Sequence, residues 1–153
     1  MGTYNHTGQV VTDLERSKTF YTEVLGFEFW YEIRPPDEAT AKLNCLAPPL
    51  GVTASYLTRD GFVLELMHYS APGAAAPYQP RAMNDPGLTH LSISVDDVRG
   101  TAGKAMEYGG TIIEESDLGV ALFIRDPDGQ LLELLPESYR ASLPPKPGRG
   151  TAG

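Results

Sequence analysis

The sequence is poor in cysteine and in cationic residues, and both shortages narrow the classes of protein it can belong to. A single cysteine, Cys45, allows no disulfide within the chain, so we expect a reducing, cytoplasmic setting. The chain has 12 lysine and arginine residues against 20 aspartate and glutamate residues, a net charge of -8. This acidity argues against binding to nucleic acid or to an anionic membrane surface.

Long hydrophobic runs are also missing. No apolar stretch approaches the ~20 residues that span a bilayer, and the N-terminus lacks the cationic and apolar regions of a signal peptide. The length of 153 residues, with 41% hydrophobic and 21% charged residues, is ordinary for one globular domain or for two half-domains that share a core. We therefore expect a small-molecule partner, with no nucleic acid and no membrane.

One pattern is written twice in the chain. Residues 60–66 and 128–134 both read Asp-Gly, any residue, an apolar residue and then Leu-Glu-Leu. Upstream, His6 and His90 are each followed by Val, Asp and Gly at offsets of five, seven and twenty residues. The chain therefore holds two copies of one unit, and each copy carries one His and one Glu.

Each copy predicts a strand, a helix and three further strands. In the first copy, Thr12 and Glu15 have the spacing of a capping box that starts a helix, and Gly26 suits its end. The Asp60-Gly61 dipeptide predicts a hairpin turn. The other elements expected in this copy are strands at 5–11, 27–33, 53–58 and 62–69 and a short helix at 38–46.

The second copy repeats this order. Its expected elements are strands at 88–95, 111–115, 118–125 and 130–135 and a helix at 97–108. We place the first module at residues 1–69, a Pro/Ala/Gly-rich linker at 70–87, the second module at 88–136 and a tail at 137–153. From Gly26 to Glu65 the first copy spans 39 residues, 16 more than the 23 from Gly110 to Glu133. This surplus around residues 34–50 suits a lid or a substrate loop.

The repeated His and Glu residues predict a metal site. His90 shares one face of its strand with Ser92 and Ser94, and the alternating apolar residues share the other face. A lone strand histidine is more often structural, and a lone glutamate can pair with an arginine. Both repeated glutamates, however, lie in apolar strands, where an unpaired carboxylate is costly. Because the same two residue types recur, we expect four ligands for one divalent ion: His6, Glu65, His90 and Glu133.

These motifs resemble the vicinal oxygen chelate superfamily, which includes glyoxalase I, methylmalonyl-CoA epimerase, extradiol dioxygenases, and fosfomycin- and bleomycin-resistance proteins. The resemblance covers residues 5–136 and is carried by His6 to Ser17, Phe20-Tyr21, Val24 to Phe27, Thr89 to Asp97, and Asp126 to Gly129 with Glu133-Leu134. It implies an α+β fold of two βαβββ modules. Their eight strands would form a cupped, partly open sheet around a metal, with the helices outside.

The four expected ligands fall on the four metal positions of glyoxalase I. The resemblance thus implies a metal-dependent lyase or isomerase that chelates a substrate with vicinal oxygens and stabilises an enediolate during proton transfer. Ni, Co, Mn, Zn or Fe would suit the donor set. Glu133 is the expected catalytic base and Glu65 the alternative. Two alternatives stay open: an extradiol-type dioxygenase, and a protein that confers resistance by binding an antibiotic or another small molecule.

Two positions depart from bacterial glyoxalase I. Val10 stands where that enzyme has an arginine for a glutathione carboxylate, and Tyr69 stands where it has an asparagine, so a glutathione adduct is not favoured. Members of this size are usually homodimers, and some build each site from two subunits. His6 and Glu65 would then come from one chain, and His90 and Glu133 from the other.

Overall fold

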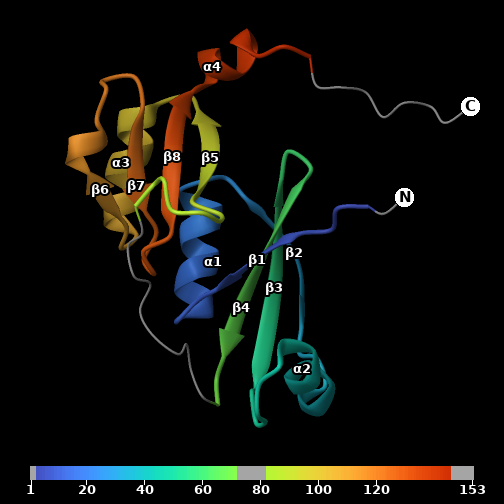
Figure 1. Ribbon diagram of the computed structural model, residues 1–153. Helices are drawn as coiled ribbons and strands as arrows, with labels where there is room; N and C mark the ends of the chain where they lie inside the picture. Colours follow the sequence, from blue (N-terminus) through green and yellow to red (C-terminus); the bar gives the residue numbers. More distant parts are fainter. Residues whose placement is uncertain (1–2, 72–81, 146–153) are drawn as a thin grey trace, which may run out of the picture.

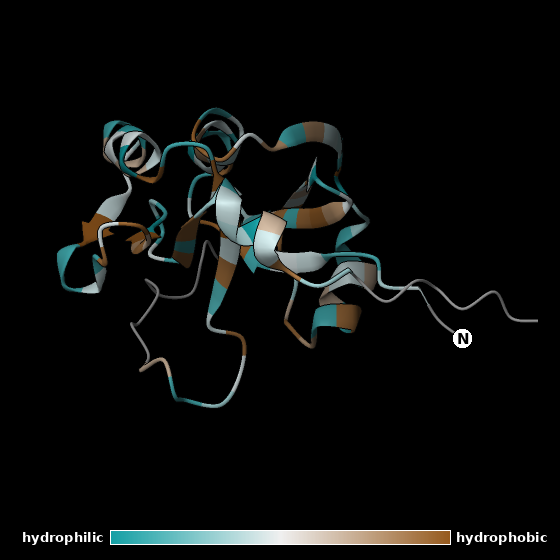
Figure 2. Cartoon of the chain, turned by 90° about the horizontal axis from the view of Figure 1, so that it is seen from above, coloured by the Kyte–Doolittle hydropathy of each residue, from teal (hydrophilic) through white to brown (hydrophobic). Residues whose placement is uncertain are grey.

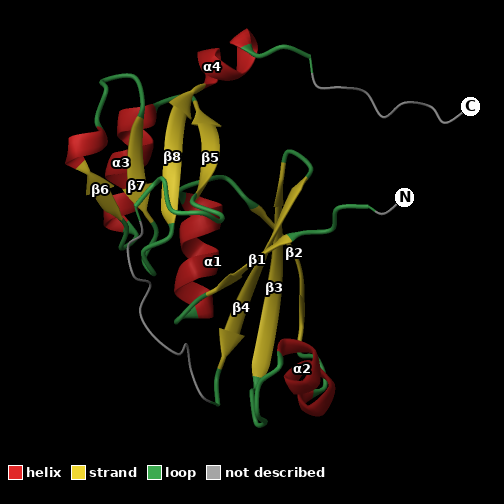
Figure 3. Cartoon of the chain, in the orientation of Figure 1, coloured by secondary structure: helices red, strands yellow, loops and turns green. Residues whose placement is uncertain are grey.

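Two four-stranded sheets with the same strand order form the framework of the chain. The computed structural model describes residues 3–71 and 82–145. The first module comprises β1 (Thr7–Val10), α1 (Leu14–Glu23), β2 (Glu28–Ile33), α2 (Asp37–Asn44), β3 (Val52–Arg59) and β4 (Phe62–Tyr69). The second comprises β5 (His90–Val95), α3 (Val98–Glu107), β6 (Thr111–Ile113), a 3-10 turn (Glu114–Ser116), β7 (Leu122–Arg125) and β8 (Leu131–Pro136), and α4 (Glu137–Ser142) follows it (Figures 1 and 3).

The two sheets confirm the internal repeat. Their orders are β1-β4-β3-β2 and β5-β8-β7-β6. β1 pairs with β4 in the parallel direction, and β5 pairs with β8 in the same way. The other neighbouring strands in both sheets are antiparallel. The α+β architecture of two βαβββ modules, expected from the resemblance, is therefore present, with the eight strands divided between two sheets. No helix in the described part of the chain is long and apolar enough to cross a membrane.

Most predicted elements are present, with differences at their ends. The hairpin at Asp60-Gly61 and the short helix before Cys45 are confirmed. The capping box is wrong in one respect: Asp13 caps α1, because its side chain accepts a hydrogen bond from the backbone of Arg16. In the second module the 3-10 turn shortens the two strands expected at 111–125. Residues 72–81 of the expected linker and 146–153 of the expected tail lie outside the described residues.

Both modules contribute to one hydrophobic core. Strands β4 and β8 each place two leucines on the core side, and all four are completely buried: Leu64, Leu66, Leu132 and Leu134. Each such side chain contributes about 1.5–3 kcal/mol through its burial. Figure 2 shows hydrophobic stretches in both modules, and these buried leucines place one face of each sheet in the core. The glutamate between each pair of leucines consequently points to the opposite face.

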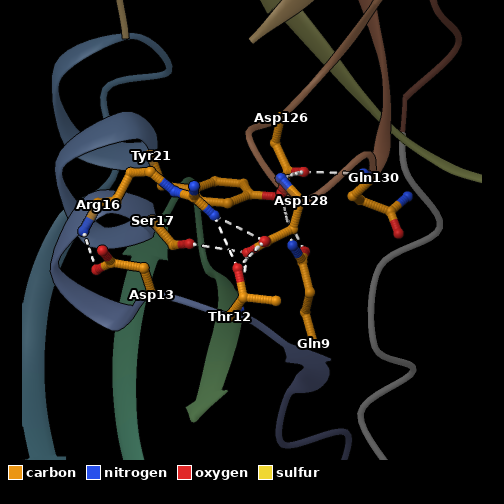
Figure 4. Close-up of polar contacts among 9 residues, drawn as sticks. All are labelled: Gln9, Thr12, Asp13, Arg16, Ser17, Tyr21, Asp126, Asp128 and Gln130. Carbon is orange, nitrogen blue, oxygen red and sulfur yellow. Dashed lines mark hydrogen bonds and ion pairs between the residues drawn. The ribbon is translucent and has the colours of Figure 1, made fainter. Parts of the chain in front are cut away.

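A buried carboxylate joins the two modules (Figure 4). Asp126, in the β7–β8 turn, is 3% exposed. Its Oδ2 accepts hydrogen bonds from Gln9 Nε2 at 2.7 Å and from the Tyr21 hydroxyl at 2.9 Å, both in the first module. Its Oδ1 accepts from the backbone of Asp128 and Gln130 in its own turn. Burial raises the pKa of Asp126, and these hydrogen bonds partly offset that rise.

In the same turn, Asp128 makes hydrogen bonds and an ion pair with residues at the start of α1. It accepts hydrogen bonds from the backbone and side chain of Thr12, and it pairs with Arg16 Nη2 at 2.7 Å. This contact explains why Thr12 does not cap the helix. The first module makes a corresponding contact with the second. Arg59, at the β3–β4 hairpin, donates to the Leu25 carbonyl in its own module and to the Ser94 carbonyl of β5 in the second module. Each repeated turn therefore ties its own module to the other.

Replacing Asp126 with asparagine should lower the free energy of unfolding by about 1–3 kcal/mol, because the amide nitrogen cannot accept the hydrogen bonds that one carboxylate oxygen now accepts. Urea denaturation at neutral pH measures the loss. The exposed Asp96 serves as the control, and Asp96→Asn should change the free energy by less than about 0.5 kcal/mol. Equal effects of the two variants would show that the buried carboxylate does not join the modules.

The buried Tyr21 should make the fold sensitive to alkali. Burial and then the nearby Asp126 charge raise its pKa well above the ordinary 10.0. The unfolded chain therefore releases this proton at a lower pH than the folded chain does. Stability is retained below about pH 10 and is lost as the pH rises above it. In urea denaturation from pH 8 to 11, the free energy of unfolding should fall less steeply with pH for Tyr21→Phe than for the wild type. Replacing the exposed Tyr4 with phenylalanine should leave this pH dependence unchanged.

Candidate metal centre

The first module brings one predicted histidine and one predicted glutamate together. Glu65 lies in the middle of β4, and His6 lies one residue before the parallel strand β1. Their Nε2 and Oε2 atoms are 3.1 Å apart. The Tyr56 hydroxyl, on the neighbouring strand β3, donates to the other oxygen of Glu65 at 2.5 Å. Both oxygens of this carboxylate therefore have partners.

A glycine leaves room for this arrangement. Gly8 lies directly opposite Glu65 in the β1–β4 pairing. A Cβ atom at Gly8 would approach the Glu65 Oε2 atom to 3.3 Å and the end of Met67 to 3.0 Å. A larger residue would therefore crowd the carboxylate.

The second module holds the other predicted pair. The Nε2 atom of His90 lies 3.6 Å from Oε2 of Glu133. Ser92, opposite Glu133 in the β5–β8 pairing, donates to the same oxygen at 2.6 Å. The Thr89 hydroxyl lies 2.8 Å from Nδ1 of His90. A partner at Nδ1 orients the ring and leaves Nε2 for the site, as the outer hydrogen bonds of metal-binding histidines do.

The four predicted ligands thus form two pairs, one on each sheet. Among residues 3–71 and 82–145, no group of three or more His, Cys, Asp and Glu residues is arranged to hold a metal ion. We call the two pairs the first half-site (His6 and Glu65) and the second half-site (His90 and Glu133). Within one chain they remain separate.

The donor spacing fits adjacent ligands of one ion. Metal–nitrogen and metal–oxygen bonds to zinc are about 2.0–2.2 Å, so two donors at right angles are about 3.0 Å apart and two tetrahedral donors about 3.4 Å apart. The observed separations of 3.1 and 3.6 Å match these values closely. Imidazole nitrogen with carboxylate oxygen is a donor set for first-row divalent metals.

The two half-sites differ in how they hold their carboxylates. In register, Tyr56 corresponds to Phe123, because each lies opposite the glutamate of its own module. Phe123 has no hydroxyl, and its ring packs edge-on against His90 at 5.3 Å. In the second module the hydroxyl comes instead from Ser92, and the described contacts of Ser92 and His90 both fall on Oε2 of Glu133.

Sequence reasoning missed the roles of Tyr56 and Ser92, although one signal was present. A two-residue turn at Asp60-Gly61 pairs Arg59 with Phe62, and counting back along both strands places Tyr56 opposite Glu65. Burial, followed by the contact with Glu65, raises the pKa of Tyr56 far above its ordinary value. The Tyr56 hydroxyl therefore stays protonated and donates a hydrogen bond to Glu65. The parallel pairing of Ser92 with Glu133 has no comparable local signal.

Aromatic side chains from β2 and β3 lie near Glu65 of the first half-site. Tyr31 stacks on Tyr56 with ring centroids 4.3 Å apart, and Trp30, 59% exposed, packs against Tyr31. Phe27 is buried in the core, because it follows α1 and faces inward, and Phe29 lies beneath Lys18. Phe27 and Phe29 therefore lie apart from the ring stack of Tyr31 and Tyr56 beside Glu65.

The 34–50 segment contains a helix fixed to the first sheet. The Asp37 carboxylate accepts hydrogen bonds from the backbone of Leu50 and Gly51. Ala41 and Leu50 pack in a small cluster with Val52 and Tyr69. The described contacts thus hold α2 against the end of β3 and β4 (Figure 1).

Two known proteins with similar sequences are named lactoylglutathione lyase. The chain is 29% identical to the lactoylglutathione lyase of Pseudomonas putida over 147 residues, covering 86% of this chain and 83% of that one. It is 28% identical to the lactoylglutathione lyase of Pseudomonas aeruginosa over 158 residues, covering 96% and 87% of the two chains.

Solved structures agree on the fold. The trypanothione-dependent glyoxalase I of Leishmania major superposes with a TM-score of 0.65 at 28% identity, covering 89% of this chain and 87% of that one. A glyoxalase family protein from Bacillus cereus gives a TM-score of 0.72 at 20% identity, covering 86% and 91%. The profile of the Glyoxalase/Bleomycin resistance protein/Dioxygenase superfamily matches residues 3–134. With its paired βαβββ modules and its two His–Glu pairs, the chain belongs to this superfamily.

Proposed function

We propose that the protein is a divalent-metal-dependent enzyme of the glyoxalase type, a lyase or isomerase that moves a proton in a small substrate with adjacent oxygen atoms. The observation that carries the proposal is the pair of half-sites, each with imidazole and carboxylate donors at metal-ligand spacing. When bound, the metal supplies Lewis-acid stabilisation of negative charge that develops on the substrate oxygens. The relatives named lactoylglutathione lyase support this reaction class.

We further propose that two chains complete each site. Both half-sites lie on the sheet faces that do not enter the shared core, and β1 and β5 are edge strands. Apolar side chains on the first sheet are left exposed: Val10 is 46% exposed and Ile33 is 42% exposed. A homodimer that sets the first half-site of one chain against the second half-site of its partner covers these faces and brings four ligands together.

The contacts support different roles for the two glutamates. Tyr56 and His6 engage both oxygens of Glu65, which suits a ligand that keeps its position. On Glu133, the described contacts with Ser92 and His90 both fall on Oε2, and Oε1 is available for a substrate proton. Glu133 is therefore the proposed base, as a positioned carboxylate near a carbon-bound proton.

The structure offers no support for a glutathione adduct at the two departing positions. The exposed side chain of Val10 is apolar and cannot form an ion pair with a glutathione carboxylate. Tyr69 is 9% exposed, and its hydroxyl accepts a hydrogen bond from Asn44 of α2. The proposed substrate is therefore another compound with vicinal oxygens. Separately, the single Cys45 supports a proposed reducing, cytoplasmic setting.

A mixed dimer tests the shared site. One chain carries His6→Ala and Glu65→Ala, the other carries His90→Ala and Glu133→Ala, and the two chains carry different affinity tags. If each site takes ligands from both chains, the mixed dimer keeps one intact site and one site without ligands. Elemental analysis after purification through both tags should find about one divalent ion per mixed dimer, against about two for the wild type.

The parent variants are the controls, and neither should hold a metal ion as a homodimer. A mixed dimer without metal, beside a wild type that binds one ion per chain, would contradict the shared site. A wild type that takes up no divalent ion at all would contradict the metal-dependent reaction itself.

Removing the Tyr56 hydroxyl should loosen the first half-site. Tyr56→Phe deletes the hydrogen bond to Glu65, and losing such an outer contact typically weakens metal binding 10–100-fold. Tyr69→Phe is a matched control, because Tyr69 is similarly buried in the same hairpin but its hydroxyl contacts Asn44. Competition with a fluorescent chelator measures both dissociation constants. Equal weakening in the two variants would mean that the tyrosine does not act through Glu65.

A further inference from the structure

A cavity of about 430 Å³ lies beside the second half-site. It is enclosed by the β3–β4 turn of the first module, by strand β5 and by α4. Its volume falls in the range of about 300–1,000 Å³ that is usual for small-molecule sites. His90 and Ser92 also line it, so the cavity is continuous with residues of the proposed metal centre.

The walls of the cavity are largely apolar. Phe62, Leu91 and Leu135 contribute side chains from three strands. Tyr139 of helix α4 and Leu143, directly after that helix, also line the cavity, and they are 47% and 48% exposed. Large apolar side chains that stay half-exposed around a hollow suit an apolar ligand group.

One end of the cavity is cationic. Arg59 is already engaged, because it donates to the carbonyls of Leu25 and Ser94. Arg140, on α4, makes one described polar contact, an ion pair with Asp60 at 3.1 Å, and its side chain is 49% exposed. Two guanidinium groups against one carboxylate leave an excess positive charge, in a chain whose net charge is -8. A guanidinium with free donors is well suited to a carboxylate.

We propose that this cavity binds the distal arm of the substrate: an apolar aryl or acyl group that ends in a carboxylate. Arg140 pairs with the carboxylate, the apolar walls enclose the arm, and the other end of the substrate reaches His90 and the metal. The assignment of the arm to a substrate rests on the proposed function. It names the substrate class as carboxylic acids with a short apolar spacer before the vicinal oxygens.

Calorimetric titration of chelator-treated protein with 3-phenylpropionate and with the neutral 3-phenylpropanol tests the cavity without metal. The acid should bind about tenfold more tightly than the alcohol, the gain expected from one charge-assisted contact. Arg140→Gln should remove this preference. Leu143→Asp should weaken binding of both probes, because it places a charge in the apolar wall.

Arg99→Gln is the matched control. Arg99 is 56% exposed and also forms an ion pair, with Asp117, but it does not line the cavity. This variant should keep the preference for the acid. The amide signals of Ser92 and Tyr139 should shift on titration in a nitrogen–proton correlation spectrum.

Three outcomes would overturn the proposal: equal affinities for acid and alcohol, loss of the preference in Arg99→Gln, or no binding of either probe. Because no metal is present, these outcomes leave the metal-dependent reaction untouched. Conversely, binding of the acid by a protein that never takes up a divalent ion would support the cavity and contradict the proposed enzyme.

Discussion

The arrangement of the whole chain depends on a carboxylate taken out of water between two modules. Asp126 is costly to bury, and its own turn supplies hydrogen bonds to one oxygen while Gln9 and Tyr21 of the other module donate to the second. The contact is therefore specific: it is satisfied at one relative position of the sheets. That position packs both helical faces into a common core and leaves both glutamate-bearing faces outside it. The metal centre that we propose to be shared between chains would follow from this joint.

The two modules share much of their scaffold but differ in the groups that surround their glutamates. Much of the scaffold is repeated, including the strand order, the helix caps at Asp13 and Asp97, and the turns that tie each module to the other. The groups around the glutamates differ. A tyrosine hydroxyl holds Glu65 from one side, and a serine hydroxyl holds Glu133 from the opposite side. The same backbone thus presents one carboxylate with both oxygens engaged and another with contacts on a single oxygen.

Much of the fold could be predicted because it is encoded locally. The hairpin at Asp60-Gly61, the start of α1 beside Thr12 and the alternation around Glu65 each follow from a few neighbouring residues, and the repeat doubled the weight of each. The joint at Asp126 could not be predicted, because the turn residues Asp126 and Asp128 act on partners more than 100 residues away. The parallel pairing of Ser92 with Glu133 could not be predicted either, because the two residues are 41 positions apart and no local turn sets their register.

The exchange of Gly8 and Tyr56 in one module for Ser92 and Phe123 in the other bears on the history of the chain. A protein made of a single module would assemble its site from identical halves, and any substitution near one carboxylate would appear near the other as well. Fusing two copies of the gene into one reading frame removes that symmetry. Each half can then change alone, which would allow the separate roles that we propose for Glu65 as a fixed ligand and Glu133 as the base.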